Sequence, residues 1–409
     1  MSDRLPSSPV LKYYLYQATI SFGFFSPIFT LFLLSRDLNY TQISTLSMLY
    51  AVLTVAGEIP TGYVGDRIGR RNSLLASSAF MTLSILGFVV VQSYLGLAVL
   101  YVLWTLSLVF RSGSGDAWLY DTLEAELDEG RFAYVRGRGG SVNSAVTVVT
   151  MLAGGVLYSV EPTLPFLASG VLNGAGVLVL LTLPKNRQYS ENGDGVEGAH
   201  DSEDTFTILE ALPVLRRQLA RPPLRSFVVY AALFFGVVAA VNTYVQPIST
   251  RTLGVPEASM GVLYAAFTAV SAVTSYYAGA VQDRFGVRGA MLVVPVLVGV
   301  FLLAPLLWPL LAFPAFFVLR GSSTLLRPIV SQFINDNAES VGRATVLSAA
   351  SMLYALVKLP FYLLGGVVAD AYSALFAVGV VGTVFLVGIV VVRVVSSPVA
   401  VGDRETTAD

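Results

Sequence analysis

The sequence predicts an all-α polytopic membrane protein with twelve transmembrane helices in two pseudo-symmetric six-helix bundles. Three observations predict this class. The chain of 409 residues is 55% hydrophobic and only 12% charged, and its mean hydropathy of +0.71 lies outside the range of soluble proteins. Its apolar segments are long enough to cross a bilayer, and a charged loop occurs twice. A β-barrel is excluded because the segments are continuously apolar rather than alternating.

Each predicted span reaches the length of about 20 apolar residues that a helix needs to cross the hydrocarbon core. A helix is required because the backbone must satisfy its own hydrogen bonds in lipid. The first apolar run is too long for a cleavable signal and lacks a small-residue cleavage site, so it counts as the first span. The predicted spans are 13–34, 41–64, 72–94, 95–119, 139–160, 162–183, 226–250, 258–282, 289–309, 310–334, 341–369 and 371–393.

The basic residues predict the orientation of these spans. The connections that follow even-numbered spans hold fifteen Arg or Lys residues, whereas the opposite connections hold only Arg36 and Arg251. Because cytoplasmic loops are enriched in Lys and Arg, we expect a multi-pass protein of the cell membrane with both termini in the cytoplasm.

The spans divide into two sets of six. We expect an N-terminal bundle over residues 1–183, a cytoplasmic linker over 184–225, a C-terminal bundle over 226–395 and a cytoplasmic tail over 396–409. The linker contains the acidic stretch "ENGDGVEGAHDSEDT", which is typical of a solvated or disordered segment.

Several function classes are excluded by missing residues. The chain has no Cys, and its one His, His200, lies in the linker, so no thiolate nucleophile or metal cluster is expected. None of its three lysines stands in a G-x-x-x-x-G-K-[ST] phosphate-binding loop, which excludes ATP-driven transport within the chain. We expect no enzyme activity, no metal, no cofactor and no nucleic-acid partner.

A ten-residue loop is the most informative repeat. "GYVGDRIGRR" at residues 62–71 recurs as "GAVQDRFGVR" at 279–288, and each copy ends the second span of its half. Such agreement indicates an internal duplication. The matched pairs, at a constant offset of 217, are Gly62 with Gly279, Asp66 with Asp283, Arg67 with Arg284, Gly69 with Gly286 and Arg71 with Arg288.

The loop between the second and third spans resembles the signature loop of the major facilitator superfamily, G-x-x-x-D-R-x-G-R-R. "EIPTG" at 58–62 and "RSGSG" at 111–115 are similar to further motifs of that family. The resemblance covers nearly the whole chain through its topology. The fifth span, "SAVTVVTMLAGGVLYSV", lacks the Gly-Pro motif of the family's drug/proton antiporters, and sugar-porter signatures are absent.

The loop residues are candidates for gating. Gly62 permits close helix approach and Gly69 a tight turn. The resemblance implies that Asp66 meets the start of the eleventh span and that the loop arginines reach an acid at the end of the fourth span, for which Asp121 is the first candidate and Asp116 the second. The alternative is a simple positive-inside anchor. The expected gating set is Gly62, Asp66, Arg67, Gly69, Arg70, Arg71 and Asp121, with the mirrored set Gly279, Asp283, Arg284, Arg288 and Asp336.

Within this mirrored set, Asp283 is expected against residues 139–141, and Arg284 or Arg288 against Asp336. Both sets would break and reform as the two halves rock, and would act as a latch on the outward-facing state.

Ionisable residues within spans are the second group of candidates, since each is costly in lipid unless it is paired or faces water. The six are Glu58, Arg111, Asp116, Arg320, Arg327 and Lys358. For proton coupling we expect Glu58, Arg111 and Asp116. The alternative for Glu58 is a structural hydrogen bond near the gate, and the alternative for Lys358 is a side chain that extends to the outer interface.

Polar residues at helical spacing complete the expected substrate site. The resemblance implies that the first, fourth, seventh and tenth spans line the cavity. Interhelical hydrogen bonding is the alternative for each polar pair. The candidates are Gln17 and Ser21, Asn242 and Gln246, Arg320 and Arg327, and Tyr354, Lys358 and Tyr362.

These observations predict a secondary active transporter that moves a small molecule by alternating access. The favoured function is proton-coupled efflux of a drug or metabolite. One alternative is ion-coupled uptake of an organic anion, which the excess of cations over acids within the spans favours, and another is a non-transporting sensor or scaffold on the same fold. We expect H⁺ rather than Na⁺ as coupling ion, and a monomer in the lipid bilayer.

Overall fold

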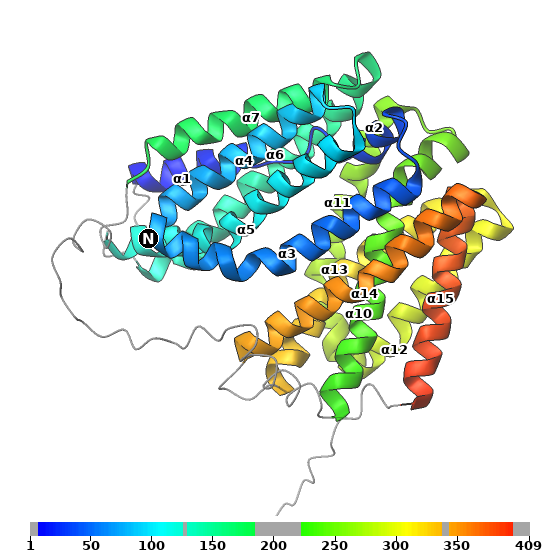
Figure 1. Ribbon diagram of the computed structural model, residues 1–409. Helices are drawn as coiled ribbons and strands as arrows, with labels where there is room; N and C mark the ends of the chain where they lie inside the picture. The colour runs from blue at the N-terminus through cyan, green and yellow to red at the C-terminus, as the bar shows by residue number, and fades with distance from the viewer. Residues whose placement is uncertain (1–6, 126–128, 185–221, 338–342, 396–409) are drawn as a thin grey trace, which may run out of the picture. The chain divides into compact units, whose positions relative to one another are not determined.

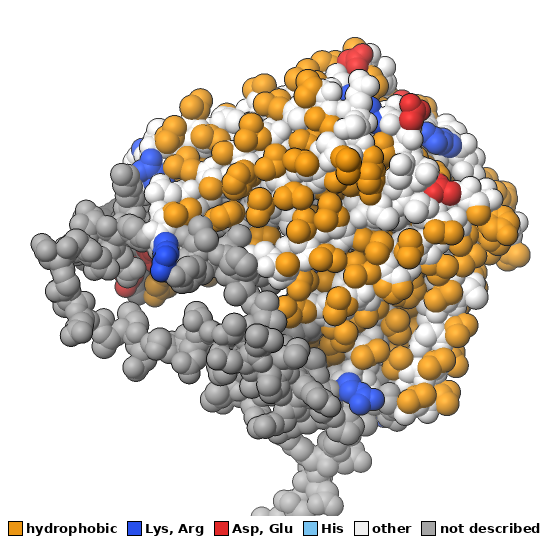
Figure 2. Space-filling model, in the orientation of Figure 1, with side chains coloured by type: hydrophobic (Ala, Val, Ile, Leu, Met, Phe, Trp, Pro, Cys, Tyr) orange, Lys and Arg blue, Asp and Glu red, His pale blue; other side chains and the backbone are white. Residues whose placement is uncertain are grey.

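A computed structural model describes residues 7–125, 129–184, 222–337 and 343–395, without the side chains of residues 58–66, 129, 222–223 and 343–349. The described residues form helices joined by short turns (Figure 1). Ten helices among them are long and apolar enough to cross a membrane. Hydrophobic side chains are spread over the part of the face in Figure 2 that is not grey, as expected for a surface in contact with lipid.

The described residues of the first half form seven α-helices and one short 3₁₀ turn. Their order is α1 (Ser8–Thr19), α2 (Phe29–Ser35), α3 (Tyr40–Ile68), α4 (Arg70–Val90), α5 (Tyr94–Ala125), η1 (Glu129–Arg131), α6 (Phe132–Val160) and α7 (Leu164–Leu181).

In the second half, the part of the chain that the structure describes forms six α-helices and three short helical turns. Their order is α10 (Pro222–Pro247), η2 (Ile248–Thr252), η3 (Glu257–Ser259), α11 (Met260–Tyr276), α12 (Ala278–Leu307), η4 (Pro309–Leu311), α13 (Ala312–Asn337), α14 (Arg343–Ala371) and α15 (Ala374–Val395). The predicted linker between the halves lies outside the described residues, apart from its first and last few positions, as does the predicted tail.

The first predicted span, 13–34, is not one continuous helix. It forms α1 and α2, with non-helical backbone between residues 20 and 28. Pro27 has no backbone N–H and disfavours helical geometry at the residue before it. The Ser21 hydroxyl accepts a hydrogen bond from the Gly23 N–H at 3.1 Å. In a continuous helix, a backbone carbonyl would have accepted this N–H.

The break is packed with aromatic side chains. Phe25 is 2% exposed and stacks on Phe166 of α7 with ring centroids 5.4 Å apart. Phe29 meets Phe88 of α4 edge to face at 5.4 Å. Offset and edge-to-face aromatic pairs stabilise a fold beyond the area they bury, so irregular backbone is tolerated here inside the protein.

The chain divides into two compact units that are each discontinuous in sequence. Unit 1 comprises residues 1–38, 49–200 and 255–265, and unit 2 comprises residues 39–48, 201–254 and 266–409. The first turns of α3 therefore belong to unit 2, and the corresponding first turns of α11 belong to unit 1. The sequence offset of 217 relates these two exchanged segments to one another almost residue for residue.

Helix packing is the same within each unit. In unit 1, α4 packs against α5 and α7, and α1 packs against α6 and α7. In unit 2, α12 packs against α13 and α15, and α10 packs against α14 and α15. The same helix contacts thus recur in both units, as expected from the internal duplication that the loop motif indicates.

Left-handed backbone residues also fall in matched pairs. Among the described residues, positive φ occurs at Asp37, Gly69, Gly254 and Gly286, with angles of 61°, 87°, 72° and 65°. The offset of 217 relates Asp37 to Gly254 and Gly69 to Gly286. The first pair precedes the exchanged turns of α3 and α11. The second lies in the signature loop and its copy, where Gly286 breaks the helical dihedrals inside α12.

Candidate functional site

A cavity of about 230 Å³ in unit 1 brings several predicted residues together. Helix α1 supplies one wall and α5 the other, because residues at spacings of three and four share one helix face. Three predicted residues, Gln17, Arg111 and Asp116, lie among its lining. The full lining is Tyr13, Tyr16, Gln17, Ile20, Leu74, Arg111, Ser112, Gly115, Asp116 and Trp118.

Hydrogen bonds hold the polar wall of this cavity in place. The amide of Gln17 donates to the Tyr13 hydroxyl at 2.7 Å, and the Asn143 amide of α6 donates to the Gln17 backbone carbonyl at 2.9 Å. The guanidinium carbon of Arg111 lies 5.7 Å from the Phe22 ring centroid. A cation held over an aromatic face is stabilised without a carboxylate partner.

Asp116 forms an ion pair that the sequence does not predict. Its carboxylate accepts from Arg136 of α6 at 2.8 Å, and the two side chains are 55% and 56% exposed. An ion pair so exposed contributes little to stability, about 0–1 kcal/mol. The main effect of the ion pair is therefore to join α5 to α6 at the edge of the cavity.

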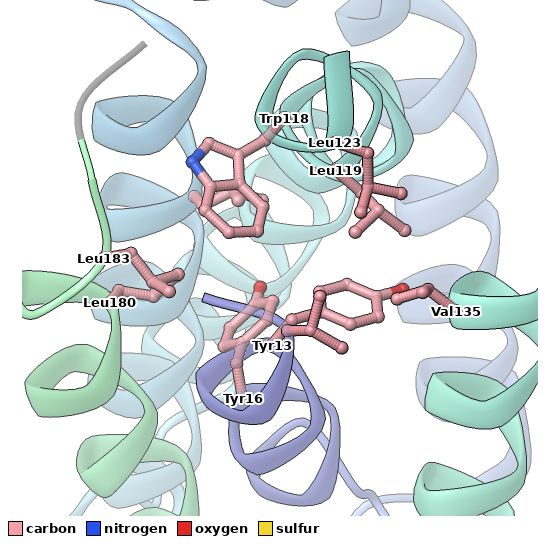
Figure 3. Close-up of a cluster of buried hydrophobic side chains, with 10 residues drawn as sticks. Tyr13, Tyr16, Trp118, Leu119, Leu123, Val135, Leu180 and Leu183 are labelled. Carbon is pink, nitrogen blue, oxygen red and sulfur yellow. The ribbon is translucent and has the colours of Figure 1, made fainter. Parts of the chain in front are cut away.

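The aromatic wall rests on a buried cluster. Trp118 of α5 stacks on Tyr13 with ring centroids 6.4 Å apart, and its indole N–H donates to the Pro184 carbonyl at 3.3 Å. Side chains of α1, α5, α6 and α7 point toward one another in this cluster (Figure 3). Tyr13, Tyr16 and Trp118 were missed as site residues, although the run "KYYLYQ" places two tyrosines on the face of Gln17.

Ser21 differs from its expected role as a substrate contact. It is 1% exposed and lies in the break between α1 and α2. Its hydroxyl shares hydrogen bonds with Thr147 and Thr150 of α6 at 3.0 and 3.1 Å. These bonds fasten the break to α6, so the structure favours the alternative of interhelical hydrogen bonding.

In the signature loop, Arg70 meets Asp121. Its Nη1 donates to the Asp121 carboxylate at 2.5 Å and to the Ala117 carbonyl at 3.0 Å. This is the acid that the sequence proposes for a loop arginine, and the contact joins the start of α4 to the end of α5. The predicted site positions Glu58, Gly62 and Asp66 lie in the stretch of α3 whose side-chain surroundings are not described.

Arg71 contacts backbone carbonyls where the sequence predicts an acid. Its guanidinium donates to the carbonyls of Leu180 and Leu181 at 3.0 and 2.9 Å. The last carbonyls of a helix have no intrahelical partner and carry partial negative charge, so a cation is favoured at this end of α7. Arg67 of the same loop is exposed.

Among the described residues, the second copy of the loop forms no ion pair equivalent to Arg70–Asp121. The offset of 217 places Val287 where Arg70 stands in the first copy. Instead, Gln282 of α12 donates to Gln332 of α13 at 3.1 Å, a neutral contact between the corresponding helices. Among the described ion pairs, none joins Arg284 or Arg288 to Asp336, contrary to expectation. Gly279, Asp283, Arg284, Arg288 and Asp336 have exposed or open surroundings.

The expected contact of Asp283 with residues 139–141 would join the two units, and it remains a prediction.

In unit 2, cations and aromatic rings gather between α10, α13 and α14. The Arg327 guanidinium carbon lies 6.0 Å from the Phe235 ring centroid, and Phe235 packs against Tyr354 with centroids 5.5 Å apart. Arg327 stands on α13 and Lys358 on the neighbouring helix α14. Arg320 lies over Phe267 of α11 at 5.7 Å. We call Phe235, Arg327, Tyr354 and Lys358 the aromatic–cation cluster.

Other predicted residues of unit 2 lie on α10 and α14. The Asn242 Oδ1 atom is buried and accepts no hydrogen bond from the described residues. Gln246 is 4% exposed, and its backbone carbonyl accepts from the Thr250 hydroxyl at 3.1 Å. Tyr362 is half-buried, two turns beyond Tyr354 on α14.

Comparison with known proteins gives the chain a family context. A model of the Major Facilitator Superfamily matches residues 17–358. The uncharacterized MFS-type transporter YxaM of Bacillus subtilis is 26% identical over 383 residues, which cover 90% of each chain. The uncharacterized MFS-type transporter YcaD of Escherichia coli O139:H28 is 25% identical over 327 residues and 78% of each chain.

The fold also matches a solved transporter. The crystal structure of the nucleoside transporter NupG aligns with a TM-score of 0.74 at 10% identity, covering 94% of this chain and 96% of NupG. At that identity the likeness concerns the fold alone.

Proposed function

Because the chain belongs to the Major Facilitator Superfamily and is a secondary transporter, we propose that its substrate is a small organic anion moved by alternating access. The charge balance of unit 2 supports this proposal. Its predicted spans hold no Asp or Glu, and their basic residues are Arg320, Arg327 and Lys358 in the interior with Arg343 and Arg393 at span ends. A cation within a membrane span is costly unless an opposite charge or water meets it, and an anionic substrate supplies that charge during each cycle.

An apolar groove of about 430 Å³ lies on α10, α14 and α15. Its lining is Leu233, Leu356, Val357, Pro360, Phe361, Leu364 and Val384. Phe235 stands two positions from Leu233, which is about 200° around α10, whereas Lys358 directly follows Val357 and borders the groove. Arg327, on α13, is not part of the groove.

We propose H⁺ as the coupling ion and Asp116 as its carrier, with Glu58 as a second candidate. Asp116 lines the cavity of unit 1 beside Arg111 and is paired with Arg136. Protonation of Asp116 would remove the charge that holds Arg136, so proton binding and rearrangement of α5 against α6 would be linked. The same scheme places Arg70 and Asp121 in a gate that opens and closes with the cycle.

Proton-coupled export of a drug or metabolite is the second candidate. Tyr13, Tyr16 and Trp118 line the unit 1 cavity beside Asp116, and aromatic faces next to a carboxylate are suited to an amphipathic cation. The two candidates therefore differ in the charge of the substrate.

Flux measurements on the purified protein in liposomes separate these candidates. With an imposed pH gradient, we expect a panel of organic anions to move faster than in empty liposomes, and amphipathic cations to move no faster. Lys358→Gln should abolish anion flux. Lys185→Gln, which removes the same charge from the predicted linker, is the matched control. Transport of cations alone, unaffected by Lys358→Gln, would overturn the anion proposal in favour of export.

A further inference from the structure

We propose that the aromatic–cation cluster of unit 2 binds an aromatic carboxylate, with its ring against Phe235 and Tyr354 and its carboxylate against Arg327 and Lys358. This inference rests on the proposed transport of organic anions and specifies their chemistry. The cluster combines ring faces, fixed cations and a hydroxyl donor: Arg327 lies over the Phe235 ring, Phe235 packs against Tyr354, and Lys358 stands one turn beyond Tyr354 on α14.

The rings keep uncovered surface for a ligand. Phe235 and Tyr354 are both half-buried, and their planes are inclined by 43° rather than stacked face to face. Core aromatics of the same helix behave differently: Phe234 is 1% exposed and packs against Phe385. A flat ring that adds to a tilted aromatic pair gains offset or edge contacts that a saturated ring of similar size does not.

Among the described residues, the two cations of the cluster stand on neighbouring helices without a carboxylate partner. Helix α13, which carries Arg327, contacts α14, which carries Lys358, and the described ion pairs include neither residue. A bound carboxylate would supply the missing negative charge, and the planar guanidinium fork of Arg327 matches the geometry of a carboxylate. Arg327 is exposed and therefore accessible to such a ligand.

The Tyr354 hydroxyl supplies an independent sign of a missing partner. Its oxygen is buried and has no hydrogen-bond partner among the described residues. Buried hydroxyls are nearly always hydrogen-bonded, so an unpartnered one is suited to a ligand atom. Tyr354 and Lys358 are four residues apart on α14 and share one helix face. The hydroxyl and the ammonium can therefore reach the same bound carboxylate.

The test compares two probes of equal charge. Binding of benzoate and of cyclohexanecarboxylate is measured on the purified full-length protein in lipid nanodiscs by calorimetry. The wild-type protein should bind benzoate about fivefold more tightly, the advantage expected from one aromatic contact. Phe235→Leu should reduce this ratio to about one while cyclohexanecarboxylate still binds. Lys358→Gln should weaken both probes together, because the carboxylate is common to them.

A matched variant locates the effect. Phe317→Leu removes an aromatic ring that packs on Phe267. Phe267 lies beside Arg320, another arginine in a predicted span of unit 2. The Phe317→Leu variant should leave the benzoate preference unchanged. If Phe317→Leu abolishes the preference and Phe235→Leu does not, the aromatic site lies at Arg320 and the inference is wrong.

Failure of the inference and failure of the proposed function give different results. Equal binding of both probes to the wild-type protein overturns the aromatic site and leaves organic-anion transport standing. Binding of neither probe, together with no anion flux in liposomes, overturns both.

Discussion

The carboxylate of Asp370, at the end of α14, accepts the backbone N–H of Tyr40, at the start of α3, at 2.7 Å. Its second oxygen accepts the N–H of Thr41 at 2.9 Å. The first N–H groups of a helix have no intrahelical acceptor and carry partial positive charge, so a carboxylate is favoured there. Residues 330 positions apart thus cap a helix, and the contact holds the first turn of α3 within unit 2.

Removing this cap should expose the first turn of α3. In Asp370→Ala, we expect amide hydrogen exchange at Tyr40 and Thr41 to rise by about twofold to thirtyfold, since a helix cap contributes roughly 0.5–2 kcal/mol. Exchange is measured by mass spectrometry of peptides spanning residues 38–48. Asp37→Asn, which removes a nearby exposed charge, should leave exchange unchanged. Equal effects of the two variants would show that net charge, rather than the cap, governs this turn.

The contact of Arg70 with Asp121 should behave as an energetic pair. Arg70→Gln, Asp121→Asn and the double variant form a cycle whose coupling energy we expect to be about 1 kcal/mol, since the side chains are 33% and 18% exposed. Thermal unfolding followed by tryptophan fluorescence gives the values. Arg71→Gln, which loses contacts to carbonyls only, should show no coupling to Asp121→Asn.

The gating role of this pair needs a separate readout. The chain has no Cys, so a single introduced cysteine reports accessibility without background. In Asp121→Asn, we expect labelling of a cysteine near the end of α5 to change relative to the parent chain, because the proposed latch is broken. Unaltered labelling and unaltered flux would remove the pair from the gating scheme.

The two left-handed glycines of the loop copies should resist substitution equally. Gly69 has φ 87° and Gly286 has φ 65°. An alanine at either position should lower stability by about 1–3 kcal/mol, because a side chain is strained in this backbone region. Gly140→Ala, inside α6 with open space around it, is the control and should stabilise slightly. Thermal melts that rank Gly140→Ala with the other two would contradict this explanation.

Neutralising Asp116 should abolish proton coupling while leaving the thermal stability of the protein nearly unchanged. Because the Asp116–Arg136 pair is more than half exposed, Asp116→Asn should shift the melting temperature by no more than about 2 °C. If Asp116 carries the proton, the variant should lose accumulation driven by a pH gradient but keep substrate exchange at equal pH. Glu161→Gln, another exposed acid of unit 1, is the control. Full gradient-driven accumulation in Asp116→Asn would exclude this residue as carrier.

Much of the fold could be predicted because a bilayer constrains sequence strongly. Long apolar segments must be helices in lipid. The loop motif that recurs at 62–71 and 279–288 indicates the internal duplication. The break between α1 and α2 was missed because hydropathy does not distinguish a continuous helix from one interrupted by irregular backbone. In this case Phe25 and Phe166 bury that backbone inside unit 1.

The site was predicted less completely than the fold. Gln17, Arg111 and Asp116 come together in one cavity, since their spacing places them on helix faces that turn inward. Ser21 has the same spacing but faces α6, and Arg136 was not proposed because its partner lies 20 positions away on another helix. Hydropathy and spacing predict on which face of its helix a residue lies, but they do not identify the residue that it contacts on a neighbouring helix.

By itself, the sequence determined that the chain is a membrane protein of twelve predicted spans in two related halves, because composition and repetition are properties of the chain. Only the tertiary structure decided which charges meet. It paired Arg70 with Asp121, placed a neutral Gln282–Gln332 contact in the second copy and set Asp370 on the first turn of α3. The physical reason is that an ion pair or a helix cap depends on distance in space, and packing between helices distant in sequence sets that distance.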